Sequence, residues 1–128
     1  MAISDLVQYE ATFDLDLKHP INGEDLGIVF HVRSAECDAA KKVLRVTLNK
    51  QLAAQKKGKN LSIQEGEEYE LKRVSACMAG WDWGDQEFIK GEGAPEFTPE
   101  NVDAVLKVEW IYKQVSEAIS DIANFTRS

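Results

Sequence analysis

The last stretch of the chain, residues 97–125, constrains the fold more than any other feature. Thr98 and Pro99 suit a helix start. The threonine hydroxyl can accept a hydrogen bond from a free backbone N–H group of the first turn, and proline lacks only an N–H group that has no partner at this position. Apolar residues then recur at steps of three and four, as on one face of an amphipathic helix. They are Val105, Val108, Ile111, Val115, Ile119 and Ile122. An unbroken helix would be about 40 Å long at 1.5 Å per residue, so we also consider a break near residues 107–108.

The N-terminal part of the chain shows a pattern that is typical of strands. Phe13, Leu15 and Leu17 alternate with charged residues, and a second apolar segment, 26–32, follows the turn-rich stretch 19–25. Two such segments joined by turn-forming residues predict a β-hairpin. A lone hairpin is only marginally stable in water, so this one must pack on the helices or pair with another chain.

Two more helices are predicted in the middle of the chain. Ser34 can cap a helix that runs to about Lys57, with a narrow apolar seam at steps of four. The seam consists of Ala40, Leu44, Leu48 and Leu52, with Val43 beside it. Ser62 and Glu65 have the spacing of a capping box, and we expect the helix that begins there to end at Gly80.

Opposite charges are separated along this chain, which has a formal net charge of −7. The segment 41–59 holds seven cations and no acid, whereas 64–70 and 82–103 are rich in acids. This separation favours head-to-tail self-association, so we expect a homo-oligomer. The basic helix could instead dock on the acidic second helix of its own chain, form a solvated face that aids solubility, or contact nucleic-acid phosphates. It has no aromatic residues and the chain is acidic overall, so we do not expect nucleic acid as a partner.

The segment 80–96 contains four glycines, one proline and two tryptophans, and we expect this connection to fold back on the core. Aromatic side chains dominate the hot spots of protein interfaces. The tryptophans and the apolar face of the last helix are therefore the predicted partner-binding set, with core packing as the alternative for each tryptophan. The set is Trp81, Trp83, Trp110, Ile111, Val115, Ile119 and Ile122.

The residues predict no catalytic, cofactor or metal site. Asp82, Asp85 and Glu87 lack the spacing of a calcium-binding loop. His19 and His31 have no serine or cysteine nucleophile in a recognised setting. We therefore expect a protein that is not an enzyme.

Cys37 and Cys77 are the two cysteines of the chain, and neither has a CxxC or Cys/His companion. We expect free thiols rather than a disulfide or a zinc site. No apolar run approaches the roughly 20 residues that span a bilayer, and the first residues lack the features of a signal peptide. The sequence therefore predicts a cytosolic protein without a membrane segment.

Several short motifs follow one another in a characteristic order. They are Pro20-Ile21-Asn22-Gly23-Glu24-Asp25-Leu26-Gly27-Ile28, then Gly80-Trp81-Asp82, then Phe97-Thr98-Pro99-Glu100-Asn101, and finally Ile119-Ser120-Asp121 and Asn124-Phe125. This order resembles that of the tail assembly chaperones of long-tailed (siphovirus) bacteriophages. The likeness spans most of the chain and consists of turn, cap and packing signals rather than catalytic motifs.

The resemblance implies a role in phage tail morphogenesis. Such chaperones bind the tape-measure protein and the tail-tube subunits while the tube polymerises. They are made in the host cytoplasm, are absent from the mature virion, and tend to oligomerise. Two alternatives stay open: a small structural phage protein, such as a head–tail joining or tail-terminator protein, and a nucleic-acid-binding regulatory protein that acts through the basic helix 41–59.

The expected architecture is a single α+β domain, because 128 residues suit one domain. Residues 1–33 would supply the N-terminal β-hairpin. Residues 34–128 would supply three to four helices that form most of the core, with a long C-terminal helix or helix pair.

Overall fold

The computed structural model describes residues 2–59 and 62–126, and it has the α+β class that the sequence predicts. Its three strands form an antiparallel sheet in the order β1-β2-β3. The strands are β1 (Phe13–Lys18), β2 (Asp25–Val32) and β3 (Met78–Asp82). The α-helices are α1 (Asp38–Lys56), α2 (Ile63–Ala76), α3 (Pro99–Leu106) and α4 (Glu109–Ser120). Short 3-10 helices, η1 (Ile3–Asp5) and η2 (Ile122–Phe125), lie near the two ends of the chain.

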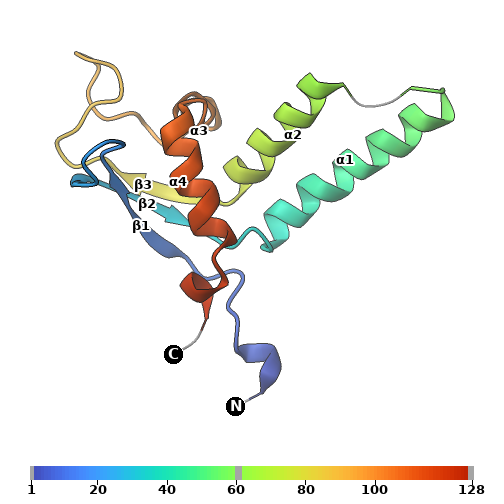
Figure 1. Cartoon of the computed structure of the whole chain (residues 1–128), viewed down its shortest axis with the longest axis horizontal. Coiled ribbons are helices and arrows are strands. Elements are labelled where there is room, and N and C mark those ends of the chain that lie inside the picture. The colour runs from blue at the N-terminus through green and yellow to red at the C-terminus, as the bar shows by residue number, and fades with distance from the viewer. Residues whose placement is uncertain (1, 60–61, 127–128) are drawn as a thin grey trace.

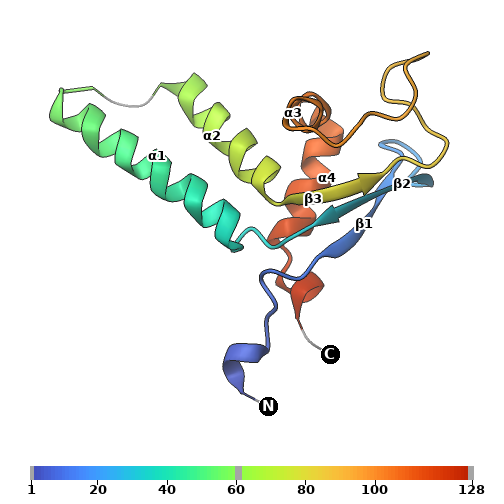
Figure 2. The ribbon, with the colours of Figure 1, turned by 180° about the vertical axis from the view of Figure 1, so that it is seen from behind.

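The sheet and the C-terminal helices form a body of two layers, from which α1 and α2 project together (Figure 1). We call this projecting helix pair the arm. In Figure 1, α4 crosses one face of the sheet, and Figure 2 shows from behind that none of the helices in residues 2–59 and 62–126 lies over the opposite face. The core therefore lies on one side of the sheet, and the arm reaches away from it.

The predicted β-hairpin is confirmed. β1 and β2 pair antiparallel, with Phe13 opposite Val32 and Leu15 opposite Phe30. Side chains alternate between the two faces of a strand, so these apolar residues share the face that α4 covers. Asp14 points to the other face, where its carboxylate lies 2.7 Å from Nδ1 of His31. The alternation in the sequence thus corresponds to one apolar and one polar face of the sheet.

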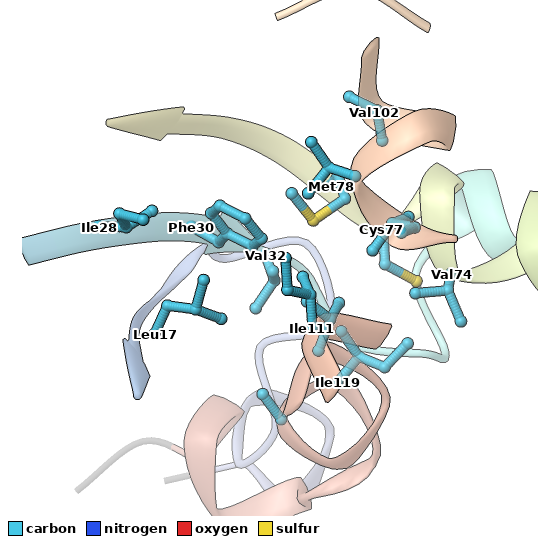
Figure 3. Close-up of a cluster of buried hydrophobic side chains, with 14 of the residues drawn as sticks. Leu17, Ile28, Phe30, Val32, Val74, Cys77, Met78, Val102, Ile111 and Ile119 are labelled. Carbon is cyan, nitrogen blue, oxygen red and sulfur yellow. The ribbon is translucent and has the colours of Figure 1, made fainter. Parts of the chain in front are cut away.

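The core is built from side chains of the sheet, the helices and the segment that joins α2 to β3 (Figure 3). Phe30 and Leu17 are its largest fully buried side chains. Ile111 and Ile119 of α4 lie beneath the sheet, and Val74 of α2 anchors the base of the arm. The core therefore includes only the inner end of the arm.

The C-terminal stretch is a helix pair, so of the two alternatives that the sequence left open, the one with a break near residues 107–108 is observed. Thr98 caps α3, since its side chain accepts a hydrogen bond from the Asn101 N–H at 3.2 Å. α3 ends at Leu106, and Val108 has extended backbone dihedral angles before α4 begins. The break allows each of the two short helices to turn its own apolar stripe towards the core.

The prediction that the helix beginning at Ser62 extends to Gly80 is wrong. Its capping box is present as predicted, but α2 ends at Ala76 and the next residues form β3. β3 pairs with β2, with Trp81 opposite Phe30 and Gly80 opposite His31. This pairing satisfies backbone groups that the free edge of the hairpin would otherwise expose. The region 34–128 is therefore not wholly helical.

The helix predicted to follow Ser34 begins four residues later, at Asp38. The Ser34 hydroxyl instead accepts from the Glu36 N–H at 3.1 Å, which stabilises a turn ahead of α1. The Glu10 carboxylate accepts from the Asp38 N–H at 2.8 Å. A residue 28 positions away therefore caps the helix, and a search for local capping residues could not find it.

The predicted apolar seam of α1 is also wrong, except at Ala40, which is buried. Leu44, Leu48 and Leu52 are exposed instead. A different stripe of α1, on which Val43 and Thr47 are half-buried, faces α2. Because this contact with α2 uses small and polar side chains, the three leucines stay on the surface of the arm.

Candidate functional site

The structure separates the seven predicted partner-binding residues into three groups. Trp83, Ile111, Val115 and Ile119 are buried, Trp81 and Trp110 are half-buried, and Ile122 is exposed. Val115 and Ile119 pack under the sheet, so they belong to the core of the chain rather than to its surface. That these residues bind a partner stays a prediction. Only Trp81, Trp110 and Ile122 of the set have side chains that solvent can reach.

Three members of the set meet around one pocket. Trp83, Trp110 and Ile111 line a pocket of about 250 Å³ at the end of the sheet, beside the start of α4. Its remaining lining residues are Leu17, Leu26, Ile28, Gln86, Glu87, Phe88 and Val108. We call it the tryptophan pocket. Its walls are mostly aliphatic and aromatic, as is usual for a site that accepts an apolar group.

The tryptophan pocket lies within a cluster of aromatic rings. The Trp83 ring centroid is 5.7 Å from that of Trp81 and 5.9 Å from that of Phe88. Trp81 also meets Phe97 edge to face at 5.2 Å, and its Nε1–H donates to the Pro95 carbonyl at 3.0 Å. Edge-to-face contacts of this kind stabilise aromatic clusters beyond their area burial. The cluster attaches the long connection to β3, as the sequence predicts.

The buried Nε1–H of Trp83 has no acceptor in the part of the chain that the structure describes. The Trp83 side chain is only 4% exposed. Leaving a buried donor unpaired costs about 1–3 kcal/mol. This residue therefore combines an apolar wall of the pocket with an unused hydrogen-bond donor.

Polar side chains of the connection hold its backbone rather than a ligand. The Asp82 carboxylate accepts from the Gly84 N–H at 2.9 Å, and the Glu87 carboxylate accepts from the N–H groups of Gly91 and Gly93, both at 3.1 Å. Gln86 donates to the Leu26 carbonyl at 3.1 Å and so joins the connection to β2. These bonds shape the rim of the tryptophan pocket.

Gly84 holds the connection close to β2, and alanine is expected to destabilise the protein there. Its φ is +56°, and an added Cβ would lie 2.9 Å from the Gly27 carbonyl oxygen. We expect Gly84→Ala to lower the free energy of unfolding by about 2–4 kcal/mol in urea denaturation. Gly93→Ala is the control, because its φ of +71° is similar but no atom lies within 4 Å of the added Cβ. If both variants lose equal stability, the close approach to Gly27 has no role.

Both histidines form contacts within the hairpin. His19 accepts through Nδ1 from the Ile21 N–H at 3.2 Å in the hairpin turn, whereas His31 pairs with Asp14 on the open face of the sheet. Across residues 2–59 and 62–126, no three His, Cys, Asp or Glu side chains lie close enough together to hold a metal ion. Within the same residues, no helix is both long enough and apolar enough to cross a bilayer.

Both cysteines are buried free thiols at the base of the arm. Burial raises the pKa of the Cys77 thiol to about 12, and the neighbouring Cys37 acts in the same direction. The Cys77 Sγ also donates to backbone carbonyls of Ser34 and Arg73 at 3.5 and 3.4 Å. Cys77 therefore stays protonated at neutral pH, and a protonated thiol is a weak nucleophile.

Sequence reasoning missed several residues of the tryptophan pocket, above all Phe88, Leu26 and Val108. Phe88 carried one usable signal, because a large apolar side chain in a polar, glycine-rich connection usually packs against something. Val108 carried a second signal, since it lies on the apolar stripe of the last stretch. Leu26 carried none, because its place in the pocket depends on how the hairpin and α4 are placed. Comparison with known protein families found no match, and comparisons with curated proteins and solved structures found none either.

Proposed function

We propose that this protein is a tail assembly chaperone of a long-tailed phage, which binds the tape-measure protein and tail-tube subunits during tail morphogenesis and catalyses no reaction. The order of sequence motifs supports this role, and the tryptophan pocket supplies a place for a client to bind. On this proposal the protein acts in the host cytoplasm and is absent from the mature virion.

The observation that carries the proposal is the apolar pocket that gathers Trp83, Trp110 and Ile111. Its volume of about 250 Å³ lies below the roughly 300–1,000 Å³ of pockets that enclose small-molecule ligands. A pocket of this size suits one or two apolar side chains of a client. An amphipathic client helix presents such side chains at steps of three and four.

Co-expression with the tape-measure protein from the same phage genome tests the proposal. We expect the protein to keep the tape-measure protein soluble. We expect Phe88→Ala and Trp110→Ala to reduce the soluble fraction severalfold, because truncating an aromatic hot-spot residue commonly costs 2 kcal/mol or more, about 30-fold in affinity. Sedimentation of lysates followed by quantitative blotting measures the soluble fraction.

Ile21→Ala is the matched control, because it truncates an exposed apolar residue that lies outside both the predicted partner-binding set and the pocket. We expect it to keep wild-type activity. Circular dichroism confirms that each variant is folded. Equal solubilisation by all the folded variants would exclude the tryptophan pocket as the client site. A tape-measure protein that stays insoluble with the wild-type protein would contradict the function itself.

A further inference from the structure

The arm exposes a stripe of leucines that nothing in the described part of the chain covers. Leu44, Leu48 and Leu52 are 42%, 46% and 57% exposed. They are four residues apart, so they lie one above the other on the same side of α1. Three adjacent apolar side chains on a projecting helix are a common feature of surfaces that bind another helix.

Cations border the leucine stripe. Lys41 and Arg45 are four residues apart, and Lys56 lies four residues after Leu52, so these three line its edge. Lys41 also lies 5.9 Å above the ring of Tyr9. Three ion pairs occur within the described residues, and none of them includes a residue of α1. The arm therefore presents an amphipathic helix face with unpaired positive charge.

A complementary surface lies on α2. A groove of about 610 Å³ runs between α2 and the corner of α3 and α4. Its apolar lining comes from Ile63, Leu71 and Tyr112. Its charged and polar lining residues are Gln64, Glu67, Glu68, Glu70 and Lys107, and Gly66 completes it.

Two of the groove's acids are available for a partner. Glu70 is already bonded to Arg73 at 3.1 Å and to the Tyr112 hydroxyl at 3.3 Å. Glu67 and Glu68 are exposed, and neither forms an ion pair within the described residues. The groove thus combines apolar side chains with three acids and one cation, so its charge is mainly negative, whereas cations border the leucine stripe.

The chain's own α1 does not occupy this groove. None of the groove's lining residues belongs to α1. The crevice between α1 and α2 shares Glu68 with the groove, and its other residues from α2 are Glu65, Tyr69 and Lys72. Successive residues of a helix are about 100° apart around its axis, so positions 69 and 72 lie on the opposite side of α2 from Ile63 and Glu67. A basic, leucine-bearing helix in the groove must therefore come from another molecule.

We propose that the arm of one copy of this protein docks in the groove of a second copy. The leucine stripe would lie on Ile63, Leu71 and Tyr112, with the cations of α1 beside Glu67 and Glu68. Each copy has one arm and one groove, so the contact is heterologous and joins molecules head to tail. The groove shares no lining residue with the tryptophan pocket, so the proposed assembly contact does not use the client site.

Charge reversal tests this interface in the purified, nuclease-treated full chain by sedimentation velocity over a concentration series. We expect the wild-type protein to associate. Lys41→Glu with Arg45→Glu, and separately Glu67→Lys with Glu68→Lys, should each weaken association at least tenfold, because like charges then face each other. Mixing the two variants should restore association, since each reversed surface then meets one of opposite charge.

Controls and a second variant keep the test decisive. Glu96→Lys with Glu100→Lys reverses two exposed acids outside the groove and should leave association unchanged. Leu48→Ser should weaken association without changing the charge. Three results would each overturn the proposal. The wild-type protein is monomeric throughout the series, nuclease abolishes its association, or the charge-reversed variants associate normally. A mixture of folded variants that fails to associate would also overturn it.

Discussion

Val115→Asp is expected to leave the protein unfolded at room temperature. The Val115 side chain is 0% exposed and lies in the core between α4 and the sheet. An unpaired buried carboxylate costs several kcal/mol, and the lost apolar contacts cost about 1.5–3 kcal/mol more. This sum is comparable with the whole stability of a small domain, about 5–15 kcal/mol. Loss of the helical circular dichroism signal measures the effect.

Ile122→Asp is the matched control for that prediction, because Ile122 continues the same sequence pattern but is 60% exposed. It should fold normally. A folded Val115→Asp protein would show that this face of α4 is not core. Because Val115 and Ile119 support the fold, aspartate at either position cannot report on partner binding, and variants at the tryptophan pocket are the suitable probes.

Phe30→Ala should have the second largest effect, lowering the free energy of unfolding by about 3–5 kcal/mol. Phe30 is fully buried in the central strand, with ring centroids 5.7 Å from Trp81 and 6.1 Å from Trp83. Its loss leaves a cavity that the strands on both sides cannot close. Urea denaturation, followed by tryptophan fluorescence, measures the change.

Ile21→Ala is the control for Phe30→Ala, because Ile21 is 90% exposed in the hairpin turn. Substitutions at such surface positions usually change stability by no more than about 0.5 kcal/mol. A loss below about 1 kcal/mol for Phe30→Ala would mean that the sheet and α4 do not share the tightly packed core described above.

The sequence predicted the elements whose signals are local. Alternation of Phe13 and Leu15 with acids revealed the hairpin, and Ser62 with Glu65 marked the start of α2. Thr98 marked the start of α3 in the same way. Each of these signals lies within a few residues of the structure that it specifies, so no knowledge of the tertiary fold was needed.

The errors concern elements that distant parts of the chain determine. β3 forms because β2 presents an unpaired edge to residues that lie about 50 positions later. The leucines of α1 have helical spacing, which shows that a helix forms but not which of its faces meets α2. In both places the decisive information was the position of another element.

The candidate site shows the same difference between local signals, which the sequence reveals, and contacts between distant segments, which it does not. Trp83, Trp110 and Ile111 were predicted as partner-binding residues because aromatic and apolar anchors are typical of interfaces, and the structure brings them to one pocket. Their neighbours Leu26 and Phe88 come from the hairpin and the connection after β3. Nothing in the sequence indicated that these segments meet, so the pocket itself could not be predicted.

The central claim is the proposal that the protein is a tail assembly chaperone. Titration of the purified protein with purified segments of its proposed client, the tape-measure protein encoded in the same genome, tests that claim most directly. Isothermal calorimetry should show saturable binding to at least one helical segment. Trp110→Ala should weaken that binding about 30-fold, whereas Ile21→Ala, which truncates an exposed residue outside the pocket, should leave it unchanged. If the folded wild-type chain binds no segment of the tape-measure protein, the account is contradicted.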